Sequence, residues 1–374
     1  MLPVMLKPIS GCNMGTIINK LWWIILLLLA FSSFDCALER KKSIPADLKN
    51  KIVFLCSDGI CTINSDGTDL KVIVPSAEGG PFSNPHWSTD KRRIAFNGNV
   101  KGSSRIMIVD NDGSDSKILG LPRPKSKNSK PGEIRVEWGK YDLQFGDWSP
   151  SGKYFSYSHG FLGVNYGGVM STDGEIKTEL NGVDFSFAGE HSIMFVEWFI
   201  SKTTAAGSRI VRWDLKEKKR QIMTEGEGAF HYKPVFSSQA DRIAYAVDSV
   251  ALPNELWIMN VNGSAKKRLA SQDDFVGKRL QIIEFSPDGE KILFLPDNGD
   301  RSSIYVVNND GTGLHVVVGD IVNSGGGADW SPDGKEIIFT SDKDGNQELY
   351  IVNIEGNDLK RLTYNSTTDC CPDW

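Results

Sequence analysis

A repeated unit of about 40 residues constrains the fold of this chain more than any other feature of its sequence. The clearest copy, residues 328–363, reads ADWSPDGKEIIFTSDKDGNQELYIVNIEGNDLKRLT. Short apolar β runs alternate in it with tight turns, of which Pro332-Asp333-Gly334 is the first. Four antiparallel strands in a unit of this length are typical of one blade of a β-propeller.

The unit recurs upstream, marked by an aromatic residue followed by serine at the end of its first strand. Six such pairs are present: Trp87-Ser88, Trp148-Ser149, Phe185-Ser186, Phe236-Ser237, Phe285-Ser286 and Trp330-Ser331. The strand run that starts at Lys51 has no such pair before it, and the sequence finishes on Trp374, so we expect the two ends to share a seventh blade. We therefore predict an all-β, seven-bladed β-propeller of four-stranded antiparallel blades, whose ring is closed by pairing of the N- and C-terminal strands.

Cysteines cluster in the blade where the two ends are expected to meet: Cys56, Cys61, Cys370 and Cys371. Alignment with the last complete blade places Cys56 opposite Cys370, and Trp374 opposite Ile52. A Cys56–Cys370 disulfide would lock the ring and a Cys61–Cys371 disulfide would be the second, although four cysteines allow more than one connectivity. A zinc site of four thiolates is the less favoured alternative, because adjacent cysteines depart from the usual C-x2-C spacing.

The N-terminal 37 residues have the layout of a secretory signal peptide. Lys7 and Lys20 precede the apolar run LWWIILLLLAF, which is short for a membrane span, and small residues follow it. Met14 is an alternative start of this signal. We predict a signal peptide in residues 1–37, a short linker to residue 50 and the propeller in residues 51–374. The protein is then periplasmic or secreted; an uncleaved membrane anchor is the first alternative, and a lipid anchor on Cys36 the second.

Composition narrows the range of partners. The hydrophobic share of 40% and the charged share of 24% are ordinary for a soluble globular protein. A formal net charge of -5 at pH 7, spread over the whole sequence, provides no basic face for a phosphate backbone. We therefore expect no nucleic-acid partner, membrane contact only through an uncleaved N-terminal segment, and a monomer.

Stacking the repeats aligns a set of mostly acidic side chains directly before the aromatic position: His86, Asp147, Asp184, Val235, Glu284, Asp329 and Asp373. The first strand of a propeller blade borders the central channel, so these carboxylates are expected to form a negative ring there. Such a ring can hold a calcium ion or a basic group of a partner. The structural alternative, which we favour, is that each carboxylate accepts hydrogen bonds from the adjacent blade.

Signs of catalysis in the sequence are few. Of the five histidines, only His86 and His231 fall near the channel strand, and a lone histidine there is more often structural than a ligand. The G-x-S-x-G elbow of hydrolases is absent, and no set of nucleophile, base and orienting residue stands out. We therefore predict no catalytic residue, no resident cofactor other than the calcium option, and a binding protein in preference to an enzyme.

The pattern W-S-P-D-G-K-x-I-x-F-x-S-D-x-D-G-N-x-x-L-Y-x-x-N, from Trp330 to Asn353, resembles the repeat of TolB-type, WD40-like propellers. The resemblance covers Lys51 to Trp374, which is the propeller alone, because too little chain precedes Lys51 for the α/β domain that TolB carries. It implies a non-enzymatic protein-binding or scaffold module of the cell envelope, with an envelope protein or peptide as partner. The alternative that related propellers imply is a carbohydrate-active lyase or hydrolase with a metal in the channel.

Overall fold

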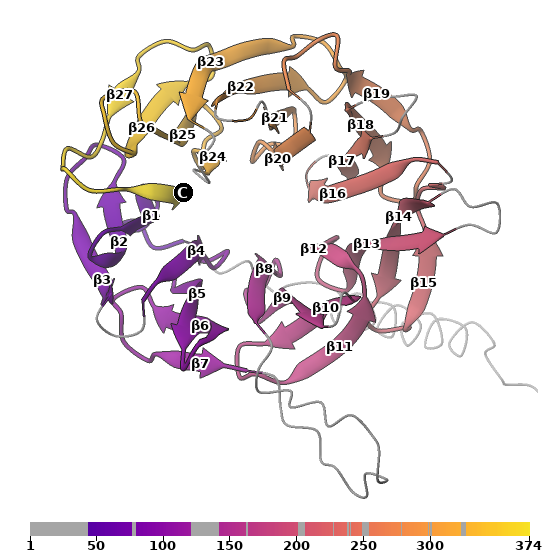
Figure 1. The fold of residues 1–374 in the computed structure, drawn as a ribbon, viewed down its shortest axis with the longest axis horizontal. Coiled ribbons are helices and arrows are strands. Elements are labelled where there is room, and N and C mark those ends of the chain that lie inside the picture. The colour runs from indigo at the N-terminus through magenta and orange to yellow at the C-terminus, as the bar shows by residue number, and fades with distance from the viewer. Residues whose placement is uncertain are drawn as a thin grey trace, which may run out of the picture. The chain divides into compact units, whose positions relative to one another are not determined.

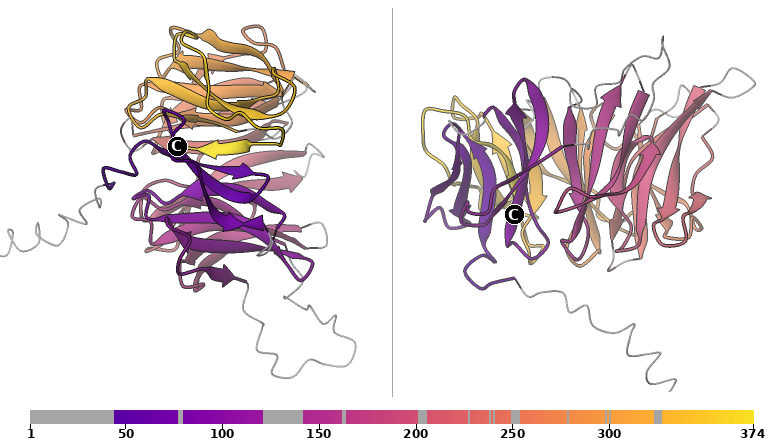
Figure 2. Two further views of the ribbon diagram at one scale, coloured as in Figure 1. Left: turned by 90° about the vertical axis from the view of Figure 1, so that its left-hand side faces the viewer. Right: turned by 90° about the horizontal axis from the view of Figure 1, so that it is seen from below.

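The structure is a computed structural model that describes residues 44–374, apart from 77–79, 121–141, 162–163, 201–205, 227, 238, 240, 249–253, 278, 298, 300 and 323–326. The predicted signal peptide lies outside the described residues, so it stays a prediction. The described strands are arranged as a ring of sheets (Figure 1) and run between the two faces of that ring (Figure 2). Among the described residues, no helix has the length and apolar character needed to cross a membrane.

Five of the sheets have four strands in an antiparallel meander. The sheet at the chain ends orders β28 (Cys370–Asp373), β1 (Lys51–Cys56), β2 (Gly59–Asn64) and β3 (Lys71–Pro75). The next has β4 (Phe82–Trp87), β5 (Arg93–Val100), β6 (Ser103–Asp110) and β7 (Lys117–Leu119). The third has β8 (Leu143–Trp148), β9 (Tyr154–Phe161), β10 (Val164–Ser171) and β11 (Ile176–Asn181). The fourth has β20 (Arg279–Phe285), β21 (Lys291–Asp297), β22 (Arg301–Asn308) and β23 (His315–Val322). The fifth has β24 (Ala328–Trp330), β25 (Glu336–Ser341), β26 (Glu348–Asn353) and β27 (Lys360–Arg361).

The remaining strands form one eight-stranded sheet, so the prediction of seven separate four-stranded blades is wrong. Its strands are β12 (Val183–Phe187), β13 (Ser192–Ile200), β14 (Ala206–Asp214), β15 (Lys219–Ile222), β16 (Phe230–Ser237), β17 (Arg242–Asp248), β18 (Glu255–Asn260) and β19 (Lys267–Ala270). The join is a parallel pairing of Ser208 in β14 with Phe230 in β16. The described strands thus form five four-stranded blades and this one larger sheet.

The second strand of every repeat carries a central aromatic side chain that is almost fully buried: Phe54, Phe96, Tyr157, Phe195, Tyr245, Phe294 and Phe339. Each lies two residues after the residue that pairs with the aromatic position of the first strand. In the last repeat, for example, Trp330 pairs with Ile337, and the buried ring is that of Phe339. Strand residues two apart share one face, so these rings fill the spaces between sheets with the neighbouring aliphatic side chains. Burial of this repeated face provides the main stabilisation of the fold.

Closure of the ring by pairing of the two ends is confirmed, because β28 pairs antiparallel with β1. The predicted register is confirmed at the end of the chain, since Val53 lies opposite Asp373, but it is wrong at Cys370, which lies opposite Leu55 and not Cys56. A bulge in β28 places three steps of that strand against two of β1, and the sequence alignment had assumed regular pairing. The ring of Trp374 still packs against the cluster that contains Ile52.

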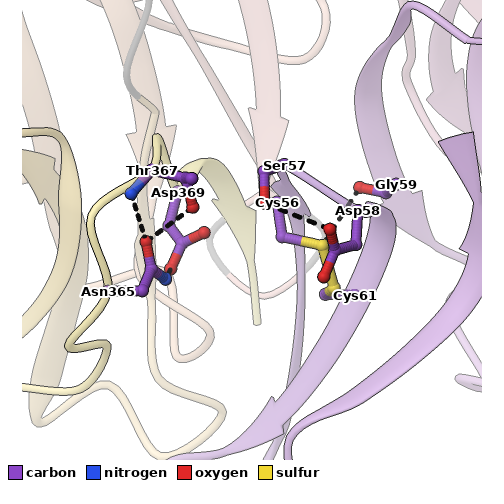
Figure 3. Close-up of a disulfide and its surroundings, with 8 residues drawn as sticks. All are labelled: Cys56, Ser57, Asp58, Gly59, Cys61, Asn365, Thr367 and Asp369. Atoms are coloured by element: carbon purple, nitrogen blue, oxygen red, sulfur yellow. Dashed lines mark hydrogen bonds between the residues drawn. A yellow bond between two sulfur atoms is a disulfide. The ribbon is translucent and has the colours of Figure 1, made fainter.

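The predicted disulfide pairing is also wrong, since Cys56 is bonded to Cys61 across the β1–β2 turn (Figure 3). Their Cα atoms lie 5.9 Å apart. Cys61 is opposite Phe54, so Cys56 and Cys61 are diagonal neighbours on one face of the hairpin. Cys370 is opposite Leu55 and therefore on the other face, out of reach of Cys56.

Candidate binding site at the ring axis

The first strand of each repeat lies closest to the ring axis (Figure 1). These strands are β4, β8, β12, β16, β20, β24 and β28. Several of them contain a bulge just before the aromatic position, and residues such as Asn84 and Lys233 adopt left-handed φ angles of 51° and 49° there. The bulge breaks the two-residue alternation, so it decides which side chains of the strand point toward the axis.

The structure brings together five of the predicted site residues, one from each four-stranded sheet, and we call them the axial cluster: His86, Asp147, Glu284, Asp329 and Asp373. Their charges influence one another: Asp373 and Asp147 act on His86, and Asp329 acts on Glu284. Four carboxyl groups and one imidazole therefore share one region around the axis, as the sequence predicts.

The carboxylates of the cluster link neighbouring sheets through backbone N–H groups. Asp373 accepts the N–H of Trp87 at 2.9 Å with one oxygen, and its other oxygen lies 2.9 Å from Nδ1 of His86. Asp329 accepts the N–H of Trp374 at 2.5 Å and that of Trp330 at 2.6 Å. The structural alternative from the sequence is thus confirmed for these two residues, and the bonds between Asp329, Trp374, Asp373 and Trp87 run across the site of ring closure.

Crowding raises the pKa values of Asp147, Glu284 and Asp329, which makes these side chains weaker acids than usual. Loss of water, followed by repulsion from Asp373, raises the pKa of Asp329 to about 7. Burial and the charge of Asp329 raise the pKa of Glu284 well above its usual value, and the two side chains hydrogen bond to each other. The raised pKa favours the protonated form of Glu284, and in that form its carboxyl donates the hydrogen bond to Asp329.

Asp147 and His86 complete the cluster. Asp147 is exposed, yet the surrounding strands displace enough of its water to raise its pKa to about 6, against the lowering effect of His86. Burial opposes a charge on His86, but its hydrogen bond to Asp373 and the nearby carboxylates outweigh that effect and raise its pKa. The cluster carries a negative charge that His86 offsets only in part.

Two predicted residues lie elsewhere. Phe187, not Phe185, occupies the aromatic position of β12, because it pairs with Ile193 as Trp330 pairs with Ile337. Asp184 is therefore the bulge residue, with φ 52°, and accepts the N–H of Lys233 at 3.0 Å. The expected place of Asp184 in the ring of carboxylates was wrong by two residues, since the sequence alignment followed Phe185-Ser186.

His231 is also not part of the axial cluster. It is 8% exposed, and its Nδ1 lies 3.0 Å from the carbonyl oxygen of Ser208, while Ser208 Oγ donates to the His231 carbonyl at 2.7 Å. Burial lowers the pKa of His231. The residue thus helps to join β14 to β16 in the eight-stranded sheet.

Sequence reasoning missed a cationic pair nearer the start of the axial strands. The Nζ of Lys233 donates a hydrogen bond to the carbonyl of Gln281. Burial lowers the pKa of Lys233, and the negative charge of Asp184 partly offsets this effect. The guanidinium of Arg279 lies 4.8 Å from the ring centre of Tyr232. A proline two residues before the aromatic position could have located the bulge that contains Lys233. This proline is shared by three segments: N-P-H-W, K-P-V-F and C-P-D-W.

A sheet ring with the first strand of each repeat innermost defines the chain as a β-propeller protein. Residues 193–374 match the family of the TolB beta propeller domain, PD40. The resemblance that the repeat predicts is confirmed over these residues, which make up just under half of the chain. No curated protein sequence matches the chain.

Solved structures share this fold at low sequence identity. TolB from Acinetobacter baumannii has a TM-score of 0.55 and 14% identity, over 88% of this chain and 68% of that chain. An oligogalacturonate lyase in complex with manganese has a TM-score of 0.52 and 11% identity, over 84% of each chain. The propeller domain of the Trilobed protease from Pyrococcus furiosus has a TM-score of 0.59 and 14% identity, over 84% of this chain and 94% of that chain. These similarities concern the fold alone, since proteins with such folds differ in function.

Proposed function

We propose that the chain is a secreted or periplasmic, non-enzymatic propeller that binds a protein or peptide of the cell envelope, as a scaffold module, through a basic group at the ring axis. The observation that carries this proposal is the convergence of four carboxyl groups from four sheets at one place, with raised pKa values for Asp147, Glu284 and Asp329. A lysine or arginine side chain placed there would relieve their repulsion and favour their ionised forms.

A basic side chain fits the cluster better than a calcium ion does. Both oxygens of Asp329 and both of Asp373 already lie at hydrogen-bond distance from N–H groups or His86. Calcium requires six or more free oxygen ligands, whereas a cationic side chain can bind through charge and one or two hydrogen bonds. Within the described residues, no group of three or more His, Cys, Asp or Glu side chains is placed to hold a metal ion. Calcium binding stays a prediction, which a calcium titration of the melting temperature tests.

The envelope setting rests on two features of the chain. The N-terminal 37 residues have the pattern of a signal peptide, and the Cys56–Cys61 disulfide suits an oxidising compartment. TolB-type propellers, which this chain resembles, act at the bacterial envelope and bind proteins. We therefore infer that the partner is an envelope protein or peptide with an exposed basic segment.

The test is binding of a lysine- and arginine-rich peptide to the full chain, measured by calorimetry at two salt concentrations. We expect Asp147→Asn to weaken binding about fivefold or more and to reduce its salt dependence, because Asp147 is the most exposed carboxylate of the axial cluster. Asp173→Asn is the matched control, since that side chain is 82% exposed in an outer turn, and should bind like the wild type. Equal binding by Asp147→Asn and the wild type would place the partner elsewhere, and a pull-down from envelope extracts without a specific partner would argue against the function itself.

The alternative function predicted from the sequence is that of a metal-dependent carbohydrate lyase or hydrolase, and it can be tested on the same protein. The relevant observation is the His86–Asp373 pair at the axis, since a histidine oriented by a carboxylate can serve as a base. Metal analysis and an activity screen on acidic oligosaccharides separate the two functions. Turnover that requires a bound metal and is lost in His86→Gln would replace the binding proposal.

A further inference from the structure

Cys370 and Cys371 are adjacent in β28, and their sulfur atoms are in contact. The two Sγ atoms lie 3.1 Å apart, and the pair is not joined in a disulfide. In a regular strand, successive side chains point to opposite faces of the sheet, which keeps neighbouring thiols apart. A local distortion of β28 therefore holds these thiols together.

The distortion is the bulge at Cys371, whose φ of 58° lies in the left-handed region. Asn84 and Lys233 occupy the same place in β4 and β16, and a proline follows each of the three residues. Side chains other than glycine seldom adopt this conformation, and asparagine, with a short polar side chain, is among the favoured exceptions. The same bulge that other sheets build with Asn84 or Lys233 thus turns two consecutive cysteines toward each other in β28.

The two thiols differ in exposure and in electrostatic surroundings. Cys370 is 8% exposed, whereas Cys371 is half-buried. A hydrogen bond from Cys370, together with His86 and the N–H of Gly327, outweighs burial and lowers the pKa of Cys371. The hydrogen bond to Cys371, followed by burial, raises the pKa of Cys370. Cys371 is therefore the more accessible and the more nucleophilic thiol, with Cys370 directly behind it.

We propose that Cys370 and Cys371 form a redox-active dithiol that low-molecular-weight disulfides oxidise to a vicinal disulfide. This site is independent of the binding function proposed above. A disulfide bond is about 2.05 Å long, so the two sulfur atoms need to approach by only about 1 Å. Because Cys370 pairs with Leu55, the new bond forms within the strand that closes the ring.

The oxidation takes place in two exchange steps. The Cys371 thiolate attacks one sulfur of the small disulfide, a mixed disulfide forms, and the departing thiolate takes up the proton that Cys371 released. Cys370 then loses its proton and attacks the Cys371 sulfur, the bond between Cys371 and the small molecule breaks, and a second small thiol leaves with that proton. Two protein thiols are oxidised and one small disulfide is reduced to two thiols.

The experiment uses the full chain exposed to oxidised glutathione, followed by alkylation, tryptic digestion and mass spectrometry. Cleavage after Arg361 gives a peptide, residues 362–374, that separates Cys370 and Cys371 from the Cys56–Cys61 disulfide. We expect this peptide to lose two hydrogens and to resist alkylation until it is reduced. A peptide that still takes up two alkyl groups after oxidant treatment would overturn the proposal.

Single variants test the order of attack. Cys370→Ser should accumulate a mixed disulfide with glutathione on Cys371, and Cys371→Ser should form one on Cys370 about tenfold more slowly, because thiolate fraction and access set the rate. Equal rates would overturn the assigned roles of the two thiols. If a serine variant does not fold, the unaltered protein provides a second measurement: phenylarsine oxide, which binds closely spaced thiol pairs, should protect the 362–374 peptide from alkylation, and absence of protection would contradict the dithiol.

Discussion

Asp329 connects the chemistry of the axial cluster to the stability of the ring. Its carboxylate accepts the N–H of Trp374, and its pKa of about 7 lies far above the ordinary value of 3.8. Between these two values the folded chain holds more protons than the unfolded chain. The stabilisation is therefore complete at low pH and is lost as the pH rises toward 7.

We expect the wild type to lose on the order of 1 kcal/mol of unfolding free energy through Asp329 between about pH 4.5 and about pH 7.5, a figure reduced for partial exposure. Asp329→Asn should flatten this part of the profile in denaturant titrations monitored by circular dichroism. Asp112→Asn is the control: hydrogen bonds from Ser114 lower the pKa of Asp112, so its contribution changes only below about pH 4. Parallel profiles for Asp329→Asn and the wild type would show that Asp329 does not titrate in this range.

Residues in the left-handed region explain why sequence alignment misplaced individual side chains. Asp184 and Cys371 both occupy bulges, where one extra residue breaks the regular alternation and shifts the pairing by one between the two sides of the bulge. The residue types at these bulges have little in common, but the following proline is shared by Cys371 and Lys233. Only the observed φ angles show that this proline follows a bulge residue.

Strands β18 and β26 begin with the same glutamate, and each glutamate bonds an arginine of the following strand. Glu255 lies 2.8 Å from Arg268, and Glu348 lies 2.8 Å from Arg361. The pairs differ in enclosure, because the Arg268 side chain is 53% exposed and that of Arg361 only 20%. Glu348 also accepts the N–H of Asn365 at 3.1 Å, so it holds the loop that leads to β28.

Glu348→Gln should therefore destabilise the protein by about 3 kcal/mol, because it removes the buried counter-charge of Arg361 and leaves only the more exposed Asp344, at 3.4 Å. Glu255→Gln, the matched variant, should cost about 1 kcal/mol or less, because water can solvate the exposed Arg268. Urea unfolding of both variants measures the difference. Equal losses of unfolding free energy in the two variants would mean that the different exposure of Arg268 and Arg361 has no effect on the cost.

The ring as a whole depends on contacts between segments at opposite ends of the sequence. Trp374 packs against the cluster containing Ile52 and Phe54, and its N–H is bonded to Asp329 in a different sheet. Lys91 adds to the same junction, since its Nζ donates to the carbonyls of Lys49 and Lys51 at 3.2 and 2.8 Å. Removal of these contacts would expose the edge of β1.

We expect Trp374→Ala to lower the unfolding free energy by about 3 kcal/mol, through loss of buried apolar contacts at the junction. Trp198→Ala removes the same side chain from a 53% exposed position and should cost less than about 1 kcal/mol. Thermal and denaturant unfolding of the two variants provide the comparison. If Trp374→Ala were no more destabilising than Trp198→Ala, the junction would contribute little to the stability of the ring.

Local patterns in the chain were sufficient to predict the all-β class, the repeated strands, the TolB-type repeat, pairing of the two ends and five of the axial side chains. Strand formation depends on apolar runs and turn residues close together in the sequence, such as those from Trp330 to Phe339, so a single sequence contains it. The acidic residues before the aromatic position followed from the same periodicity.

Tertiary structure alone decided the sheet count, the register of β28, the partner of Cys56 and the places of Asp184 and His231. One parallel pairing at Ser208 merges strands that the repeats treat as separate, and one bulge changes which residue of β1 lies opposite Cys370. The sheet count and the register of β28 depend on hydrogen bonds between strands that do not follow one another along the chain, whose energies differ little between neighbouring registers until all packing contacts are in place.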